Sequence, residues 1–566
     1  MPAALAGIGQ RAPGWWHAHR PGWTAVALVV GVAVQLVPLV VFPTAMTQDG
    51  PAHLDGAWVL LHHGDHSAAG AALRANYSVD LGPVPNMLTT FLLTGLLAVV
   101  GPDVAEKVVV AGFIVLLVAG LRYALRGVDP RAGWLAVAAL PLAGGQLVAY
   151  GFYNFCWGVA LALVVIGLAL RRRNGWRARH TLAAALLLAL TWSAHLMPWA
   201  LAVALLGGLA AGRWVVAVRA GVRPWRAAIV HLLPPTMALL PSAVLSVVYL
   251  AGGGGQHGGA AGWGAVGRLW WLVTLYRPLV VDSWWELVPA VGVAIVLGSL
   301  LGTALRRRSG PAGSAGPTED AAPAADRVVL GAAAVLTALA VLLVPWEMGP
   351  AYGFLPDRLA WFPPLLVVLF CATRLPRRIE LQRAAVVVIV LAATIATMVR
   401  LPTQLADERL AAELLSVADD IPEGSTFAVL RFAGHPSALV PRPGRPDPLR
   451  HLSSRLAVEV GGVDVGHYEA IYPYFQVQFL ADGVRQAIDP GLDGLDAVPP
   501  WVHLDAAHRR LQYVLVVGLD RAEGWVRTAQ RTAGVLAQLR DRYVQVAQSG
   551  PSGDVSVWRL QNSTTG

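Results

Sequence analysis

Hydrophobic and polar residues fall into long blocks over the first 400 residues, where apolar runs are separated by short polar segments. A membrane hydrocarbon core is about 30 Å thick, and a helix of roughly 20 apolar residues spans it. The pattern therefore predicts a polytopic α-helical membrane protein with about 11–12 transmembrane helices. The candidate segments are 24–42, 87–101, 104–121, 133–150, 152–170, 181–195, 196–212, 227–250, 286–304, 328–344, 358–374 and 384–400.

A different pattern begins at residue 401, where the long apolar runs stop. Short β-type runs occupy 425–430, 511–518, 543–550 and 555–560, and helical stretches occupy 406–424 and 521–543. Such a mixture predicts a C-terminal α/β domain over residues 401–566. Residues 1–400 form the predicted membrane domain, and residues 43–86 form its long first polar loop.

Composition supports a membrane protein and argues against several soluble classes. The chain is 56% hydrophobic and only 14% charged, with a mean hydropathy of +0.55. No phosphate-binding loop is present, because the glycines at 252–255 neither follow a strand nor end in Gly-Lys-Ser/Thr. Both cysteines, Cys156 and Cys371, lie in apolar segments, so no disulfide framework is predicted.

Positive charge sets the predicted orientation in the membrane. Arginine runs at 171–173, 213–226, 306–308 and 374–383 lie between apolar segments, and the positive-inside rule places them in the cytoplasm. The high pI thus reflects membrane topology, and no nucleic-acid partner is expected. The N-terminus is then cytoplasmic, and loop 43–86 and the C-terminal domain are extracytoplasmic. An even number of crossings must separate this loop from residue 154, whereas three apolar runs lie between them. Either segment 87–101 is re-entrant or the loop contains another partial segment. The Ala-, Gly- and Arg-rich composition is typical of a GC-rich genome, and the predicted location is a bacterial plasma membrane.

The first loop opens with TQDGPAHLDGAW at residues 47–58, which places Asp49 and His53 just beyond the first apolar run. One interpretation is that Asp49 caps a helix whose first turn holds Gly50 and Pro51. The other is that Asp49 and His53, one helical turn apart, converge as a catalytic base or metal ligands. Long ordered loops of this kind usually serve a function, which favours the second interpretation. Three further histidines, 62, 63 and 66, are equally consistent with a solvated surface or with metal binding.

Together these features resemble the GT-C superfamily of polytopic glycosyltransferases. The resemblance lies in a first helix, an extracytoplasmic loop that begins with an aspartate, further helices and an outer C-terminal domain. Its motif is TQDGPAHL, supported by GFYNF at 151–155 and SAHLMP at 193–198. It implies a membrane glycosyltransferase that takes sugars from polyprenyl phosphate. The superfamily often has an acidic pair in this loop and an acidic residue in the next outer loop; Gly50, Tyr153 and Asn154 stand there instead.

Roles for individual residues follow from what such a transfer needs. An acceptor hydroxyl needs a base, and the departing phosphate needs positive charge or hydrogen-bond donors. We expect Asp49 to be the base, with His53 as its partner or alternative. The other expected substrate-binding residues are Tyr153, Asn154, His195, Arg277 and Arg358, of which the arginines and His195 are candidates for the phosphate.

Each of these residues also has a structural interpretation. An arginine at a helix end commonly reaches the lipid headgroups, and His195 could hydrogen-bond a broken helix. The tryptophan pairs 270–271 and 284–285 are more typical of interfacial anchors than of sugar platforms. The aromatic stretch 451–479 is interpreted mainly as a docking surface for the membrane helices, with carbohydrate stacking as the alternative.

Three function classes remain open on the sequence. They are a glycosyltransferase with a membrane-lipid donor and a carbohydrate or lipid acceptor, a transporter or flippase of a lipid-linked substrate, and a catalytically silent envelope-assembly scaffold. A transporter would place charged or broken helices at the middle of the bilayer. Here the polar groups gather in outer loops, which favours a site at the outer surface over a transporter; only activity separates the glycosyltransferase from the scaffold. A divalent metal is compatible with the loop but is not required by it, so the cofactor is left unassigned.

Overall fold

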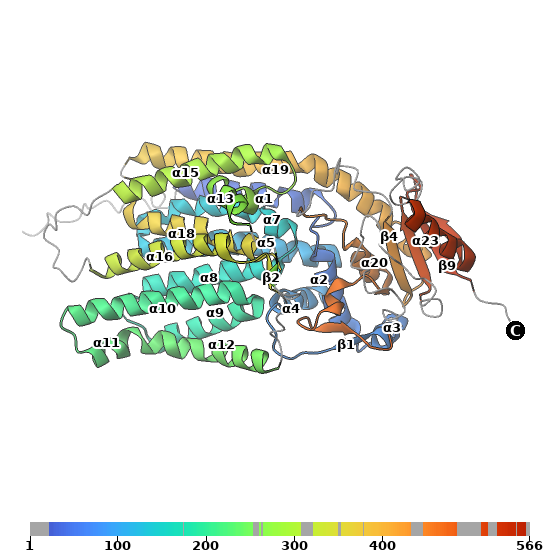
Figure 1. Ribbon diagram of the computed structural model, residues 1–566, viewed down its shortest axis with the longest axis horizontal. Coiled ribbons are helices and arrows are strands. Elements are labelled where there is room, and N and C mark those ends of the chain that lie inside the picture. The colour runs from blue at the N-terminus through green and yellow to red at the C-terminus, as the bar shows by residue number, and fades with distance from the viewer. Residues whose placement is uncertain are drawn as a thin grey trace, which may run out of the picture.

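The computed structural model consists of a helical bundle with an α/β region at one end (Figure 1). The residues described are 22–173, 175–252, 260–261, 264–306, 321–348, 353–376, 378–431, 445–483, 511–518, 529–550 and 552–561. The predicted loop at 252–255 and the first part of the predicted helix 521–543 lie largely outside them.

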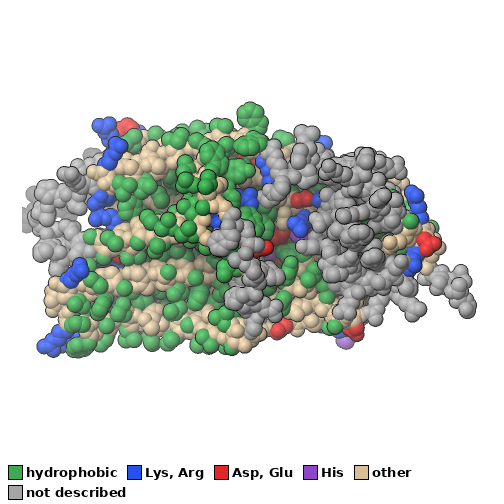
Figure 2. Space-filling model, viewed as in Figure 1, with side chains coloured by type: hydrophobic (Ala, Val, Ile, Leu, Met, Phe, Trp, Pro, Cys, Tyr) green, Lys and Arg blue, Asp and Glu red, His purple; other side chains and the backbone are tan. Residues whose placement is uncertain are grey.

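Nine of the helices in these ranges are long and apolar enough to cross a membrane. Their apolar side chains are widely exposed on the outside of the bundle, as expected for a surface that faces lipid (Figure 2). The nine helices are α1 (Trp23–Val41), α5 (Pro102–Val128), α8 (Tyr153–Arg171), α10 (Leu196–Arg219), α12 (Leu233–Ala251), η3 with α15 (Trp284–Glu286, Leu287–Arg306), α16 (Ala321–Leu343), α17 with α18 and η4 (Leu355–Leu359, Phe362–Cys371, Ala372–Arg374) and α19 (Ile379–Leu415).

Three predicted crossings are built differently. Segment 133–150 is no single helix, because it divides into η2 (Pro130–Ala139), α6 (Leu140–Ala143) and α7 (Gln146–Ala149). The break lies at Gly144 and Gly145, where a Cβ would overlap Gln35 or the carbonyl of Pro278. Segment 181–195 is α9 (Ala178–Ala194), which has 17 residues. Segment 87–101 contains only the ten-residue α4 (Leu88–Leu97), shorter than a crossing requires.

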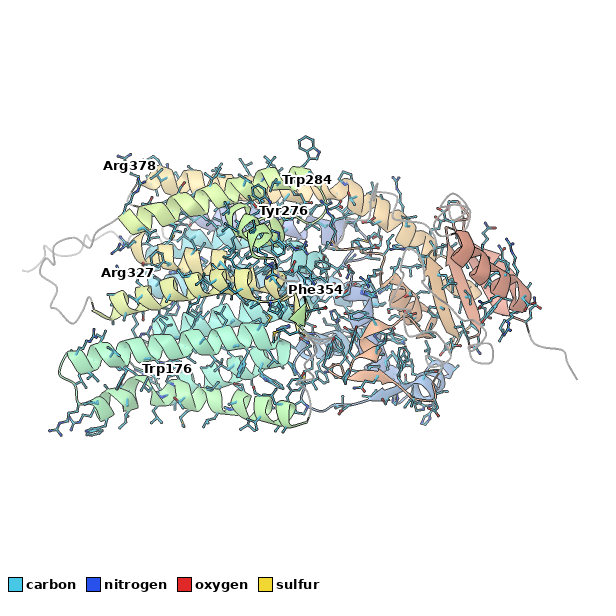
Figure 3. All side chains as sticks on the ribbon, viewed as in Figure 1. Trp176, Tyr276, Trp284, Arg327, Phe354 and Arg378 are labelled. Atoms are coloured by element: carbon cyan, nitrogen blue, oxygen red, sulfur yellow. The ribbon has the colours of Figure 1, made fainter. Side chains whose placement is uncertain are left out.

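Arginines mark the end of the bundle that lies away from the α/β region. Figure 2 shows Lys and Arg side chains gathered there, and Figure 3 labels Arg327 and Arg378 at this end. Behind the surface, Asp326 of α16 pairs with both Arg173 and Arg213. The arginine-rich segments therefore share one end of the bundle, as the charge pattern predicted.

The α/β region is built on a five-stranded mixed sheet with the order β5-β4-β7-β9-β8. The strands β5, β4 and β7 are parallel, and β7, β9 and β8 are antiparallel. All four predicted strands are present, which confirms the α/β class. The strands are β4 (Thr426–Arg431), β5 (Val463–Asp464), β7 (Tyr513–Val517), β8 (Tyr543–Gln548) and β9 (Val555–Leu560), and the helical elements are α20 (Leu452–Val460), η6 (Tyr468–Ile471) and α23 (Ala529–Arg542).

The first loop does not stand apart from this region. Its strand β1 (Tyr77–Val79) pairs with β6 (Val477–Phe479), and Val59, Leu73 and Tyr77 share a hydrophobic core with the large sheet. Its helix α2 (Gly50–His62) packs against α20. Loop 43–86 and the C-terminal region thus form one packed body; the loop's other helix is α3 (Ala68–Asn76).

Helix α19 joins the bundle to this body without interruption. It spans 37 residues and includes Pro402, so the predicted boundary at 400/401 lies inside it, and the predicted helix 406–424 is its last part followed by η5 (Ala418–Asp420). Thr44, at the end of α1, donates to Glu408 of α19 at 2.7 Å. The remaining short elements are α11 (Pro224–His231), α13 (Ala265–Thr274), α14 (Tyr276–Leu279), β2 (Ala260–Ala261) and β3 (Glu347–Met348).

Candidate active site

A cavity of about 220 Å³ opens where the bundle meets the α/β region. Phe354, labelled in Figure 3, lies in its wall at this junction. Five of the seven residues predicted for the site line it. The lining comprises Gln48, Asp49, His53, Asn86, Phe152, Asn154, Phe155, His195, Gly353, Phe354, Arg358, Arg450, His451, Tyr468, Tyr472, Tyr474 and Phe475.

Asp49 occupies the N-cap position of α2, but its carboxylate makes no capping hydrogen bond. The capping interpretation is therefore wrong. One carboxylate oxygen, Oδ1, instead accepts a hydrogen bond from Gln48 Nε2 at 3.0 Å and lies 3.6 Å from Nε2 of His451. Burial raises the pKa of Asp49 to about 6, although the neighbouring His53 and the Gln48 amide act in the opposite direction. With this pKa the carboxylate is mostly ionised at neutral pH, and its pKa lies about one unit below that pH.

His53 is held between two acceptors. Its Nδ1 forms a buried ion pair with Glu469, and its Nε2 donates to the carbonyl of Gly151 at 2.9 Å. Burial alone would lower the pKa of His53, but the Glu469 carboxylate, with Asp49, raises it to about 9. An imidazolium has no free lone pair to accept a proton, so protonated His53 cannot itself act as a base.

Arg358 points its guanidinium into the cavity wall instead of toward lipid. The group lies 4.6 Å from the centre of the Phe152 ring and donates to the carbonyl of Gly353 at 3.1 Å. Within the described residues it pairs with no carboxylate, and its buried Nε has no hydrogen-bond partner. Its charge therefore has no carboxylate counterion among the described residues.

Arg277 and Tyr153 do not line this cavity. Arg277 pairs with the buried Asp357 and lies beside two tryptophan rings, so its charge serves the packing of the bundle. The hydroxyl of Tyr153 lies 2.6 Å from Glu106 Oε1 and 2.5 Å from Thr47 Oγ1. The ring of Tyr153 packs against that of His53, with 5.4 Å between centres, so Tyr153 supports the site from behind.

Asn154 and His195 line the cavity and also hold helix ends in place. The Asn154 side chain accepts from the backbone N–H of Thr89 at 2.9 Å and donates to the carbonyl of Asn86 at 2.8 Å. It thereby supplies an acceptor to the first turn of α4. His195 is the N-cap of α10, and its Nδ1 accepts from the N–H of Met197 at 3.1 Å. The alternative interpretation of His195, as a group that bonds a broken helix, is thus confirmed.

The α/β region supplies much of the cavity wall. Gln48 and Arg450 were not predicted as site residues, although Gln48 lies within the motif TQDGPAHL and Arg450 directly precedes the aromatic stretch 451–479. His451, Tyr468 and Tyr474 belong to the aromatic stretch that was interpreted mainly as a docking surface. In the structure α20 of that stretch packs on α2 of the first loop, while the tyrosines line the cavity.

The described residues contain no group of three or more His, Cys, Asp or Glu side chains arranged to hold a metal ion. The histidine cluster of the first loop is divided, because His62 lies 2.6 Å from Asp65 while His63 contacts the carbonyl of Tyr77 at 3.1 Å. At position 50, Gly50 leaves room for Glu106: a Cβ there would overlap Glu106, Thr47 and Tyr153. A carboxylate from α5 thus lies beside the backbone position where the superfamily often has its second acidic residue.

Comparison with known proteins places the fold. No family model matches the sequence, and no curated protein matches it. Among solved structures, the chain is similar to ArnT from Cupriavidus metallidurans bound to undecaprenyl phosphate, with a TM-score of 0.55 and 12% identity over 96% of this chain and 98% of that one. The apo form of the same protein gives a TM-score of 0.53 at 12% identity, over 95% and 97% of the two chains. The oligosaccharyltransferase of Archaeoglobus fulgidus gives 0.41 at 11% identity, over 95% of this chain and 74% of that one. The chain therefore has the GT-C membrane fold.

Proposed function

We propose that this protein is a membrane glycosyltransferase that moves a sugar from polyprenyl phosphate to an acceptor hydroxyl. The observation that carries the proposal is one cavity lined by both a buried carboxylate, Asp49, and a guanidinium with no carboxylate partner in the described structure, Arg358. Structural comparison also supports the proposal, because the chain shares its fold with a protein whose structure holds undecaprenyl phosphate.

In the proposed reaction Asp49 is the general base. The acceptor oxygen forms a bond to the anomeric carbon of the sugar while the bond from that carbon to the phosphate oxygen breaks. The acceptor proton passes to Asp49, and the electron pair leaves with the polyprenyl phosphate. A carboxylate with a pKa of about 6 is ionised at neutral pH yet basic enough to assist this transfer.

Positive charge in the same cavity would stabilise the leaving phosphate. Arg358 comes from the bundle and Arg450 from the α/β region, so the two approach the cavity from different parts of the chain. The imidazolium of His53 adds a third cation behind Asp49. Fixed cations in a buried site interact with a developing phosphate charge more strongly than they would in water.

The acceptor would enter from the side of the α/β region. Tyr468, Tyr472 and Tyr474 form this wall, and tyrosine rings both stack on sugar faces and hydrogen-bond hydroxyl groups. With the arginine-rich end in the cytoplasm, the cavity and the C-terminal region lie outside a bacterial plasma membrane. The acceptor is then a carbohydrate or lipid of the cell envelope.

A transfer assay tests the proposal directly. The purified chain is reconstituted in liposomes with polyprenyl phosphates that carry radiolabelled hexoses or pentoses, and with lipid or glycan extracts from bacterial envelopes. We expect label to move to one acceptor class, and Asp49→Asn to abolish the movement. Donor binding with no transfer to any acceptor would instead support the scaffold, and movement of intact donor across the bilayer would support the transporter.

A further inference from the structure

Gln48 links the candidate base to the α/β region through both ends of one side-chain amide. Its Nε2 donates to Oδ1 of Asp49 at 3.0 Å, and its Oε1 accepts from the backbone N–H of Asp447 at 3.0 Å. The residue is 7% exposed. A reversed amide would face the Asp447 N–H with a second donor and the Asp49 carboxylate with a second acceptor, so only this orientation satisfies both partners.

The backbone at this point leaves little freedom to move. The N–H groups of Gln48 and Asp49 donate to the carbonyls of Ala149 and Tyr150, each at 3.0 Å. Gly151 adopts a φ of +80° beside them, where a Cβ would meet the nitrogen of Asp49 at 2.8 Å. With the main chain held in this way, the direction of the carboxylate depends on the side-chain torsion of Asp49 and on the groups that contact it, among them the Gln48 amide.

Asp447 is itself fixed to the α/β region. Its carboxylate pairs with Arg431 at the end of β4 and accepts from the N–H of Leu449 at 3.1 Å. Two cavity residues, Arg450 and His451, follow directly. The same short segment thus forms part of the cavity wall and supplies the N–H group that holds Gln48.

We infer that Gln48 is a positioning residue that orients the Asp49 carboxylate and makes this orientation depend on docking of segment 447–451. The inference rests on the proposed function for the role of Asp49 in transfer. The bond from Gln48 leaves the second oxygen, Oδ2, as the one to face the acceptor. When the segment moves away, the amide loses one of its two partners and can rotate, and the carboxylate loses its fixed direction.

Two substitutions of Gln48 distinguish its hydrogen bond to Asp49 from its hydrogen bond with the Asp447 N–H. Gln48→Glu can still accept from the Asp447 N–H, but it cannot donate to Asp49 and places a like charge beside it. Gln48→Met has a similar length and makes neither bond. Gln35→Met is the matched control, because Gln35 is also 7% exposed and donates to Thr397 at 3.1 Å within the bundle, outside the cavity lining.

The readouts do not require transfer activity. A hydrophobic carbodiimide labels protonated carboxyl groups, and mass spectrometry with fragmentation between residues 48 and 49 gives the pH at which Asp49 is half-labelled. Hydrogen exchange of 447–451 reports docking. We expect Gln48→Glu to raise the half-labelling pH of Asp49 by about one unit or more with little change in exchange. Gln48→Met should raise both the half-labelling pH of Asp49 and the hydrogen exchange of segment 447–451. Gln35→Met should change neither quantity.

An unchanged half-labelling pH in Gln48→Glu would overturn the inference, as would unchanged exchange in Gln48→Met. A further outcome would contradict the proposed function while leaving this inference intact. If Asp49→Asn transfers sugar normally while Gln48→Glu shifts the labelling of Asp49, Gln48 still positions the carboxylate but that carboxylate is not the base.

Discussion

His53 and Glu469 form a buried ion pair that joins the first loop to the α/β region. The two residues come from opposite ends of the sequence, and their side chains are 6% and 3% exposed. Around them α2 packs on α20, and Arg455 of α20 reaches Asp103 of α5 at 3.0 Å. Polar contacts as well as apolar packing therefore hold the cavity closed on this side.

Removal of the Glu469 charge should loosen this interface. We expect Glu469→Gln to lower the free energy of unfolding by on the order of 3 kcal/mol, because it leaves a buried imidazolium without its carboxylate. Thermal unfolding in detergent and hydrogen exchange of α2 measure the effect. Glu459→Gln on the partly exposed side of α20 is the control, with an expected change below about 1 kcal/mol. Equal effects of the two substitutions would show that the buried pair does not stabilise the interface.

The same ion pair predicts how stability depends on pH. The pKa of His53 rises from 6.5 to about 9 on folding, so the folded state binds the proton more tightly than the unfolded state. The stabilisation is complete below pH 6.5 and is lost as the pH rises through about 9. Thermal unfolding between pH 6.5 and 9.5 should show this loss in the wild type and not in His53→Asn. Parallel curves for the two proteins would contradict it.

Asp49 should set the acidic limit of transfer. Because its pKa is about 6, kcat/KM should fall about tenfold for each pH unit below that value. Asp49→Asn should lower transfer by roughly a hundred- to ten-thousand-fold. Since the carboxylate caps no helix, Asp49→Ala should fold as well as Asp49→Asn. Loss of expression in Asp49→Ala alone would restore the capping interpretation.

Arg358 should contribute directly to phosphate binding. We expect Arg358→Ala to weaken binding of undecaprenyl phosphate at least about tenfold, as measured by native mass spectrometry, because it removes a cation from a buried anion site. Arg358→Lys should recover part of the affinity through its point charge. Arg378→Ala, at the opposite end of the bundle, is the control (Figure 3). Unchanged affinity in Arg358→Ala would remove this residue from the site.

A side chain at position 50 should compete with Glu106 for space. A Cβ at position 50 would overlap Glu106, so Gly50→Ala should cost about 1–3 kcal/mol by overpacking. Adding Glu106→Ala should relieve part of that cost, and a double-mutant cycle of unfolding free energies measures the coupling. Strictly additive effects would show that the two positions do not compete for space.

Sequence patterns predicted the fold class, because the membrane helices and the strands are encoded by local properties of the chain. Apolar runs predicted the membrane helices, and the charge pattern correctly grouped the arginine-rich segments at one end of the bundle. The break at Gly144 and Gly145 was missed because the apolar residues on both sides outweigh the Gly-Gly-Gln sequence at 144–146. In the structure Gln35 approaches Gly144 closely, and the carbonyl of Pro278 approaches Gly145. The continuation of α19 past residue 400 was missed because the apolar run ends there while the helix does not.

Only the part of the candidate site that comes from the first loop and the bundle could be predicted from the sequence. Asp49, His53 and Arg358 stand next to helix ends, where their neighbours make them conspicuous. The role of Glu469 in holding His53 protonated depends on a contact between distant parts of the chain, which no local pattern contains. Arg277 resembles Arg358 in sequence setting, and only the position of Asp357 separates the two.

The pairing of β1 with β6 also constrains the order of assembly during synthesis. Ser78 and Gln478 face each other in this pair although 400 positions separate them. Domains tend to fold as the chain emerges, N-terminal parts first. Here Leu73 and Tyr77 of the first loop lack their apolar partners in the α/β region until the whole bundle and the strands after it have been synthesised. A nascent chain that stops before residue 450 therefore lacks the wall that the α/β region contributes to the cavity.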